Sequence, residues 1–487
     1  MRVQHAPATS AVGDRAEHAA APAAGLDRVW FASVLISTVV AGLSGAMRTV
    51  DLAYHVRAGT AILQTGQLPG SDTYTFTAEG RPWVDQQWGA QVVLALVHRA
   101  GGSASLLMLL GLVAGATFGF LWLACRARGA SAKAASLLVV LGLAVSLPNI
   151  SMRPQTFAFP LFTLSLWILA TRHDHPRRLW ILPGVAVLWA NLHGTFPLLP
   201  AIVGLAAVED VVTSAATARI AVVVTGVSLL ATLVNPFGVG AWSYAAGLAT
   251  NGQILYGVEE WAPPTVRTLF GAAFFGSGLL IAVYLARRRP PVGWVDLVWL
   301  GLFFVLGLAA IRSMIWWGFV APVVVAGTLE RKPRQAESSR AANVVLVGAL
   351  AALLVVMLPW WRDGVDPATG ASRLLRDAPQ HLVEATGRAL PPGARVLVNQ
   401  EWASWFEYAL PEMPVFVDSR IELFTARTWT DYFEVVDAGD GWSRILDRWR
   451  VDAVVLQRDD ELVPSIEASP EWRRVYVDRS GTLYVRT

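Results

Sequence analysis

Long apolar runs recur along the first three quarters of this chain, and they constrain its fold more than any other feature. A helix needs about 17–25 predominantly apolar residues to cross a bilayer. We place such runs at 29–47, 104–124, 132–148, 156–171, 179–191, 196–211, 219–235, 269–286, 295–311, 314–329 and 343–361. Only 15% of the residues are charged, against about 25% in soluble domains. The sequence therefore predicts an all-α polytopic membrane protein with about 11 transmembrane helices. Short runs on either side of Asn191–Pro197 leave a re-entrant hairpin open there.

Arginine and lysine in the short connections predict the orientation of these helices, because they accumulate in cytoplasmic loops. One set of connections is rich in them: Arg126, Arg128, Lys133, Arg172, Arg177, Arg178, Arg219, Arg287, Arg288, Arg289, Arg331, Lys332, Arg334 and Arg340. The short connections of the opposite set hold Arg153, Arg267 and Arg312. We therefore expect a multi-pass protein of a bacterial plasma membrane, with its amino terminus in the cytoplasm and its carboxyl terminus outside.

Changes in composition divide the chain into four parts. Residues 1–28 predict a disordered cytoplasmic tail, and 29–361 form the transmembrane domain. Within that domain, 48–103 is a large first extracytoplasmic loop whose ends predict two interfacial helices, Val50–Gln64 and Trp83–Val97. Residues 362–390 read as a linker.

The last part, 391–487, returns to soluble charge density and predicts a small extracytoplasmic α/β domain. We expect strands at Arg395–Asn399, Val415–Asp418, Ala453–Leu456, Val475–Asp478 and Leu483–Val485. Helices are expected near 401–410, 425–436, 442–450 and 460–468. Ser480-Gly481 predicts a hairpin turn between the last two strands.

Several function classes are disfavoured by what the sequence lacks. No basic stripe is interleaved with aromatic residues, so we expect no nucleic-acid partner. The single cysteine, Cys125, excludes an internal disulfide and a cysteine metal cluster. No Gly-rich phosphate loop, HExxH motif or nucleophile elbow is present, which disfavours an ATPase or a zinc protease.

Polar residues that interrupt the apolar pattern converge on one side of the membrane once the helices are threaded. They are Asp51, His55, Asp85, Arg153, His193, Glu259, Glu260 and Arg312. Ionisable residues gathered at helix ends are costly and commonly functional. Asp51 follows the first helix among apolar residues, and partial desolvation raises a carboxylate's proton affinity, which suits a general base. The alternative reading is that Asp51 caps the interfacial helix.

Over nearly the whole chain after residue 28, the sequence resembles bacterial membrane proteins of the glycosyltransferase-C type. The motifs are Asp51, Tyr54-His55, Leu68-Pro69, Tyr74-Thr75-Phe76-Thr77, Arg81-Pro82-Trp83-Val84-Asp85-Gln86-Gln87-Trp88, Arg153-Pro154-Gln155, Asn191-Leu192-His193-Gly194, Asn235-Pro236-Phe237-Gly238, Glu260-Trp261 and Phe416-Val417-Asp418-Ser419-Arg420. The chain departs from the group at Ala53-Tyr54, where bulkier paired aromatics are usual. No second acid directly adjoins Asp51, so a metal site of the oligosaccharyltransferase kind is not supported.

The resemblance implies a transferase that uses a polyprenyl-phosphate sugar donor within membrane lipids and a glycan or lipid acceptor. Asp51 is then the base, and Arg153 and Arg312 bind the donor phosphate, because guanidinium forks onto phosphate oxygens. His193 could donate to the phosphate or sugar. Snorkelling to lipid headgroups is the alternative for both arginines, and a packed turn for His193. No cofactor is assigned, and a divalent metal stays open.

Substrate contacts are predicted for a further set: His55, Asp85, Trp88, Glu259, Glu260 and Trp261. Asp85 could instead cap a helix, and the Glu259-Glu260-Trp261 cluster could be a solvated loop. The Asp418-Ser419-Arg420 motif predicts an ion pair or a cap at a strand end. Two other functions remain open: a lipid or saccharide transporter or flippase, and a non-catalytic cell-envelope scaffold. A transporter would carry charge at the bilayer midplane, where the apolar runs have almost none.

Overall fold

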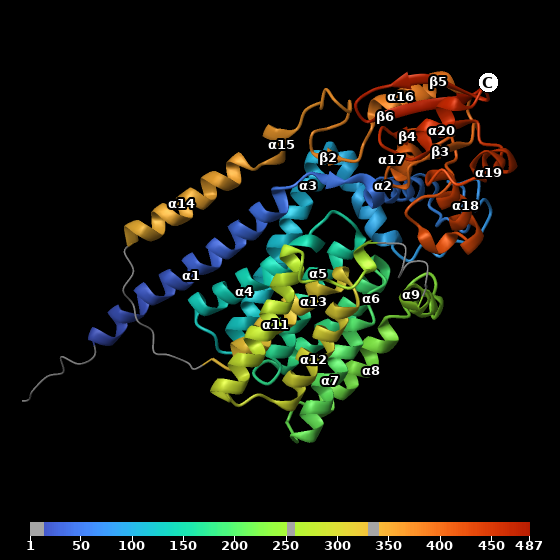
Figure 1. Cartoon of the computed structure of the whole chain (residues 1–487). Coiled ribbons are helices and arrows are strands. Elements are labelled where there is room, and N and C mark those ends of the chain that lie inside the picture. Colours follow the sequence, from blue (N-terminus) through green and yellow to red (C-terminus); the bar gives the residue numbers. More distant parts are fainter. Residues whose placement is uncertain (1–13, 251–258, 330–339) are drawn as a thin grey trace, which may run out of the picture.

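The computed structural model describes residues 14–250, 259–329 and 340–487, and shows a helix bundle joined to a C-terminal α/β domain (Figure 1). A helix lies at each predicted apolar run: α1 (Asp14–Leu43), α3 (Trp88–Ala127), α4 (Ala132–Ser146), α5 (Pro154–Ala170), α6 (Leu182–Leu192), α7 (Leu198–Val212), α8 (Ala218–Ala231), α11 (Leu269–Arg288), α12 (Trp294–Ala309), α13 (Met314–Gly327) and α14 (Arg340–Val356). The predicted all-α membrane architecture with a small C-terminal sheet domain is confirmed.

Helix lengths vary across the bundle. By length and composition, α1, α3, α11 and α4 extended by the 3₁₀ turn Leu147–Asn149 are long and apolar enough to cross a membrane, whereas other apolar helices such as α5 and α13 are shorter. Helix α1 begins at Asp14, so the second half of the predicted disordered tail is helical in the structure. Residues 1–13 of that tail lie outside the described part of the chain.

The loop segment 48–103 folds onto the end of the bundle as two helices in series. Helix α2 (Thr49–Thr65) matches the predicted interfacial helix and ends at Gly66, which adopts a left-handed conformation. Helix α3 starts at Trp88 and bends at Gly101-Gly102, where Gly102 has φ 59° and ψ −150°. Only glycine adopts this backbone region readily. The bend therefore separates the interfacial first part of α3 from its apolar second part.

Close packing of α2 on α3 fixes the position of the residues at the start of α2. A Cβ atom on Gly59 would lie 2.0 Å from the Gln91 carbonyl oxygen, so the two helices approach too closely for any side chain there. Replacing Gly59 with alanine would force the helices apart. His55, one turn before Gly59, lies against Gln91 through this contact.

Aromatic side chains fill the bundle core beneath the site described below. Phe162 packs edge-on against Trp316, Trp189 and Phe303, with ring centroids 5.0, 6.2 and 5.5 Å apart. In lipid, such packing stabilises a helix bundle through van der Waals contact. Trp316 also reaches the wall of the cavity, so the cavity rests on a closely packed core.

The C-terminal domain, here residues 380–487, is built on a four-stranded sheet of order β3-β4-β6-β5. Its elements are α16 (Gln380–Ala389), β3 (Val396–Val398), α17 (Gln400–Ala409), η5 (Ile421–Leu423), α18 (Ala426–Val436), α19 (Trp442–Trp449), β4 (Ala453–Gln457), α20 (Leu462–Ala468), β5 (Trp472–Val477) and β6 (Gly481–Arg486). Strands β3 and β4 are parallel, and β4, β6 and β5 are antiparallel, with the predicted hairpin turn before Gly481.

Two predictions for this part of the chain differ from the structure. Val415–Asp418 is not a strand: Val415 makes only isolated bridges, to Thr75 and to Val396, because its backbone is shared between the loop segment and the sheet. The predicted linker 362–390 includes α16, which buries Leu382 and Val383 against the sheet. The domain thus begins earlier than its composition indicated.

The C-terminal domain is tied to the loop segment by backbone as well as side chains. Strand β1 (Met47–Arg48), directly after α1, pairs in parallel with β2 (Leu375–Arg376). Val415 accepts from the Phe76 amide at 3.1 Å and donates to the Tyr74 carbonyl at the same distance. Short helix α15 (Pro359–Arg362) adds hydrogen bonds from Arg362 to carbonyls at the end of α1.

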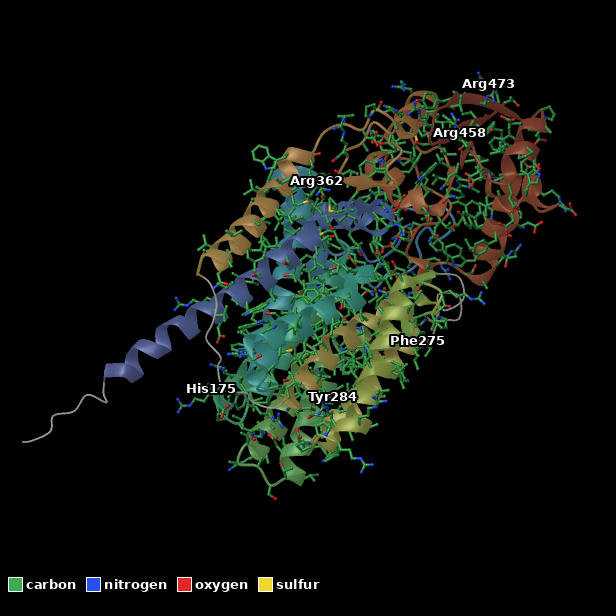
Figure 2. The ribbon with its side chains drawn as sticks, turned by 60° about the vertical axis from the view of Figure 1, so that its left-hand side comes forward. His175, Phe275, Tyr284, Arg362, Arg458 and Arg473 are labelled. Carbon is green, nitrogen blue, oxygen red and sulfur yellow. The ribbon has the colours of Figure 1, made fainter. Side chains whose placement is uncertain are left out.

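The connection between α5 and α6 lies at the end of the bundle remote from the C-terminal domain. Figure 2 shows His175 at the end of the bundle remote from the C-terminal domain, which carries Arg458 and Arg473. Arg172 lies in the same turn as His175. It is buried and forms ion pairs with Glu209 and Asp210. This connection, which carries Arg172, Arg177 and Arg178, therefore faces away from the C-terminal domain.

Candidate functional site

A cavity of about 680 Å³ lies where the bundle meets the C-terminal domain. Its wall is shared by α2, the loop before α3, the starts of α5 and α7, α9 (Gly240–Thr250), η3 (Glu259–Trp261), η4 (Ile311–Ser313) and residues 419–422. The predicted site residues that line it are Asp51, His55, Asp85, Arg153, His193, Trp261 and Arg312. Residues from six separate stretches of sequence are therefore neighbours.

Asp51 lies in the first turn of α2 and is not the helix cap. Arg48 occupies the cap position, and its side chain makes no capping hydrogen bond. The Asp51 side chain is 38% exposed, and its Oδ2 lies 4.0 Å from Nη1 of Arg153. Burial raises the pKa of Asp51 above its ordinary value, and this effect outweighs the opposing attraction of Arg153. The carboxylate is accessible from the cavity and holds protons more readily than usual.

Arg153 forms the centre of a charged cluster at this end of the cavity. Its guanidinium is almost buried and donates to Oε2 of Glu260 at 2.5 Å. Although burial of Glu260 opposes ionisation, the charges of Arg153 and Arg312 lower its pKa. Glu260 is therefore an anion held on a guanidinium that also faces Asp51.

Arg312 provides a second guanidinium in the same cluster. It donates to Oε1 of Gln155 at 2.9 Å, and its Cζ lies 4.6 Å from the ring centroid of Trp261. Trp261, predicted to contact the substrate, is thus in contact with a cation in this structure. Neither arginine reaches away from the protein in a snorkelling conformation; both line the cavity.

His193 ends α6 and is almost buried in the cavity wall. Its Nδ1 lies 2.9 Å from Oγ1 of Thr195 and accepts from the Thr195 amide at 3.2 Å. Burial lowers the pKa of His193 well below its ordinary value, and the two arginines lower it further. A neutral imidazole with Nδ1 as an acceptor carries its proton on Nε2, which can donate to a ligand.

A second polar group lines the cavity through His55 and Asp85. Gln91 donates to Oδ1 of Asp85 at 2.7 Å and lies 3.2 Å from Nδ1 of His55. Burial raises the pKa of Asp85 to about 7 and lowers that of His55 to about 3. Asp85 does not cap α3, since Gln87 precedes that helix without a side-chain cap.

The structure does not bring every predicted residue to the cavity. Trp88 donates from Nε1 to Oδ1 of Asn191 at 3.0 Å and joins the start of α3 to the end of α6, outside the cavity wall. Glu260 reaches the cluster through Arg153, without lining the wall itself. Glu259 lies in η3, and its side chain falls outside the described part of the structure.

Several wall residues were not expected from the sequence. The C-terminal domain contributes Ser419, Arg420 and Glu422, and α9 contributes Tyr244, whose hydroxyl donates to Oε1 of Glu422 at 2.8 Å. Tyr244 lies in a stretch of small residues with no pattern that marks it. Glu422 follows the Asp418-Ser419-Arg420 motif, which was the one available signal.

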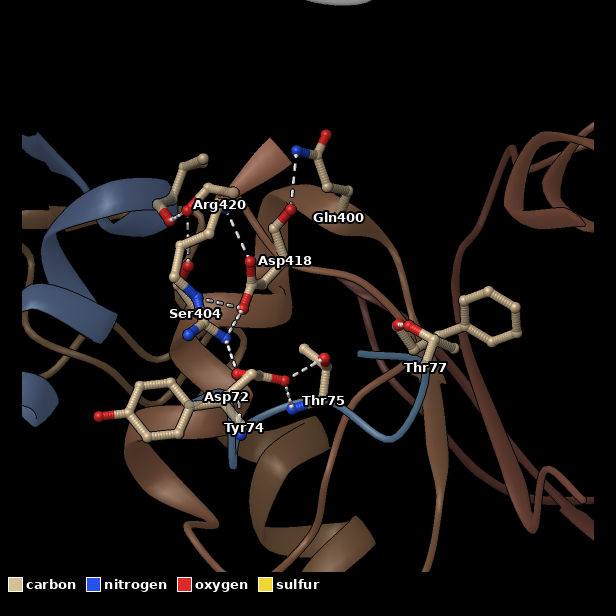
Figure 3. Close-up of polar contacts among 11 residues, drawn as sticks. Asp72, Tyr74, Thr75, Thr77, Gln400, Ser404, Asp418 and Arg420 are labelled. Carbon is tan, nitrogen blue, oxygen red and sulfur yellow. Dashed lines mark hydrogen bonds and ion pairs between the residues drawn. The ribbon is translucent and has the colours of Figure 1, made fainter. Parts of the chain in front are cut away.

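Arg420 joins the C-terminal domain to the loop segment by buried ion pairs (Figure 3). It is 2% exposed and donates to Asp418 of its own domain and, at 2.6 Å, to Oδ1 of Asp72 in the loop segment. Its Cζ lies 4.6 Å from the ring centroids of both Tyr74 and Trp83. The predicted ion pair of the motif is confirmed, and it spans two parts of the chain.

Among the residues that the structure describes, no three His, Cys, Asp or Glu side chains come together as metal ligands. Asp51 and Glu260 are separated by the guanidinium of Arg153, which contacts both. The charged cluster is therefore balanced by arginine, and the chemistry that it can perform is anion binding next to a basic carboxylate.

Two solved membrane-protein structures are similar to this one over most of its length. No family model and no curated protein matches the sequence. The Archaeoglobus fulgidus oligosaccharyltransferase in its apo form has a similar structure, with TM-score 0.53 and 11% identity over 88% of this chain and 69% of that one. ArnT from Cupriavidus metallidurans bound to undecaprenyl phosphate has TM-score 0.51 and 13% identity over 98% and 99%. The predicted glycosyltransferase-C fold is confirmed.

Proposed function

Because the chain has the glycosyltransferase-C fold, we propose that it moves a sugar from a polyprenyl-phosphate donor to a hydroxyl acceptor. The observation that carries this proposal is the Asp51 carboxylate, which faces the cavity 4.0 Å from Arg153. A base and an anion-binding group are thus adjacent in one water-accessible space. The structurally similar ArnT is described as binding undecaprenyl phosphate, and the similar oligosaccharyltransferase AglB as binding a dolichol-phosphate.

The donor fits the cavity by charge and by polarity. Its phosphate would lie on Arg153 and Arg312, with His193 donating from Nε2. Apolar residues continue the wall away from the arginines: Leu198, Ala201, Ala245, Leu248, Leu302 and Leu306. These residues come from α7, α9 and α12, and an isoprenoid chain could lie along them.

The acceptor would be activated by Asp51. Its carboxylate takes the proton of the acceptor hydroxyl as that oxygen attacks the anomeric carbon. The bond between the anomeric carbon and the phosphate oxygen breaks, and the electron pair leaves with the phosphate. Arg153 and Arg312 stabilise the charge that develops there, a contribution typically worth a few kcal/mol of barrier (about 2.7–4).

Glu260 is paired with the Arg153 guanidinium that the donor phosphate would need. Replacing Arg153 and replacing Glu260 should therefore change the affinity for the phosphate in opposite directions. Arg153→Gln should weaken binding of undecaprenyl phosphate about 10–100-fold, the scale of a hydrogen bond to a charged group. Glu260→Gln should strengthen it about 2–5-fold by removing a partly exposed competing anion. Native mass spectrometry of the full-length protein measures both.

Arg267→Gln serves as the matched control, because Arg267 is exposed and lies outside the cavity wall. Its affinity for undecaprenyl phosphate should equal that of the unmodified protein. Weaker binding in the Glu260→Gln variant would contradict competition between this carboxylate and the phosphate.

The site must face outside for such a donor, and this orientation can be tested with single cysteines. The buried Cys125 is first replaced by serine. We expect Arg479→Cys, exposed on the C-terminal domain, to react with a membrane-impermeant maleimide on intact cells. Arg177→Cys, exposed at the opposite end, should react only after permeabilisation. The reverse labelling pattern would place the site in the cytoplasm.

A further inference from the structure

The cavity has two chemically different ends. Arg153 and Arg312 present hydrogen-bond donors at one end, next to Asp51. The other end presents acceptors, from Asp85 and Gln86 of the loop segment and Glu422 of the C-terminal domain. Tyr54 also lines the cavity and lies within electrostatic reach of both Asp51 and Glu422, so the two groups of residues are close to one another.

Two buried acceptors in this second end have no partner within the described residues. Oδ2 of Asp85 and Oε1 of Gln86 lack hydrogen bonds, although the two side chains are only 2% and 1% exposed. Their other polar atoms are engaged: Asp85 Oδ1 accepts from Gln91, and Gln86 Nε2 donates to the Ala190 carbonyl. An unpaired buried acceptor costs free energy that a donor supplied by a ligand would recover.

Glu422 completes this set with a carboxylate placed by tertiary contacts. Tyr244 donates to Oε1 of Glu422. Arg420, two residues before Glu422, fixes the backbone of this segment through its ion pairs with Asp418 and Asp72. Oε1 is therefore held toward α9 while the carboxylate lies in the cavity wall. Glu422 is also within electrostatic reach of Asp85.

We propose that Glu422, Asp85 and Gln86 form a saccharide subsite that binds the acceptor through its hydrogen-bond donors. The inference rests on the proposed transferase function and names the chemistry of its acceptor: clustered hydroxyl groups, or hydroxyl groups with an ammonium group. The C-terminal domain is then part of the site, because it supplies Glu422. The reacting hydroxyl would lie between this subsite and Asp51.

Binding of small saccharides to the full-length protein tests the subsite without needing turnover. The probes are methyl glucoside and methyl glucosaminide, followed by saturation-transfer NMR. Glu422→Ala should weaken binding about 10-fold or more, the scale of a hydrogen bond to a charged group. Binding of undecaprenyl phosphate should stay within about twofold, because its ligands lie at the other end. Glu461→Ala, an exposed acid of the same domain, is the matched control.

The conservative variant separates the two kinds of acceptor. If the subsite recognises hydroxyl groups, Glu422→Gln should retain binding of methyl glucoside. If it recognises an ammonium group, the same variant should lose binding of methyl glucosaminide only. Unchanged saccharide binding in Glu422→Ala, or no binding of either probe by the unmodified protein, would overturn the subsite. Equal loss of saccharide and undecaprenyl phosphate would also overturn it, since Glu422 would then be structural. Failure of the transferase function would instead appear as full transfer by Asp51→Asn.

Discussion

Asp51→Asn should lower the rate of sugar transfer by about 10²–10⁴-fold, the contribution typical of a general base. The amide keeps the shape of the side chain but cannot take the acceptor proton. Undecaprenyl phosphate should still bind, since the proposed phosphate ligands Arg153 and Arg312 remain. The measurement is transfer of radiolabelled sugar from a polyprenyl-phosphate donor by the purified full-length protein, with binding followed separately.

Glu412→Gln is the control for this acid-to-amide change, because Glu412 is exposed on the C-terminal domain outside the cavity wall. The pH dependence adds a second check. Burial raises the pKa of Asp51, so its basic form is lost as the pH falls through a value above the ordinary one of about 3.9. The acid limb of the rate profile should lie above that value and be absent from the residual activity of Asp51→Asn. Full transfer by this variant would remove the mechanism.

Arg420→Met should have the second large effect, on the attachment of the C-terminal domain. The change leaves the buried carboxylates of Asp72 and Asp418 without their shared cation. Removing one partner from a buried ion pair typically costs about 3–5 kcal/mol. We expect a lower thermal midpoint, faster proteolysis between the bundle and the domain, and loss of transfer because Glu422 is displaced. Thermal unfolding followed by tryptophan fluorescence measures the loss of stability.

Restoring charge balance should recover much of this loss. A triple variant, Asp72→Asn and Asp418→Asn with Arg420→Met, removes the unpaired charges, and replacing a whole buried ionic group is often close to neutral. A triple variant no more stable than Arg420→Met would show that Arg420 acts through its contacts with Tyr74 and Trp83 instead.

Glu407 provides a contrasting control in the same buried region. Burial, together with the charge of Asp418 and a hydrogen bond to its side chain, raises the pKa of Glu407 well above the ordinary value. Because the folded protein holds this carboxyl group in its neutral form, it favours the folded state at low pH. That stability is lost as the pH rises above the pKa of the group in the unfolded chain, about 4.3. Glu407→Gln should therefore be tolerated, and should gain stability relative to the unmodified protein as the pH rises.

The sequence predicted the fold because the signals that it carries are local. Apolar length predicts a spanning helix wherever it occurs, and Gly66 marks where an interfacial helix ends, whereas the bend at Gly102 was found only in the structure. The strands β3, β4, β5 and β6 were also predicted, since their apolar residues are contiguous. Val415–Asp418 looked like a strand for the same reason, but Val415 makes only isolated bridges, one of them to Thr75, 340 residues earlier in the chain, which no local pattern reveals.

The lining of the cavity was predicted in part, and the division has a physical basis. Asp51, Arg153, His193 and Arg312 interrupt apolar runs at helix ends, so threading the chain through a membrane already brings them to one face. Glu422 and Tyr244 lie in segments where polar or small residues are ordinary, and nothing in their neighbourhood marks them. Trp88 shows the opposite case, a residue with a suggestive neighbourhood that joins two helices outside the cavity.

What the sequence determined by itself is therefore the set of helices, the side on which the polar helix ends gather and the existence of a separate C-terminal domain. The tertiary structure alone decided how that domain docks on the loop segment, that Arg420 joins Asp418 to Asp72, and that Glu422 reaches the cavity. The reason is that apolar burial follows from composition along the chain. A shared cation between distant carboxylates depends on side-chain geometry across two packed surfaces, which composition does not specify.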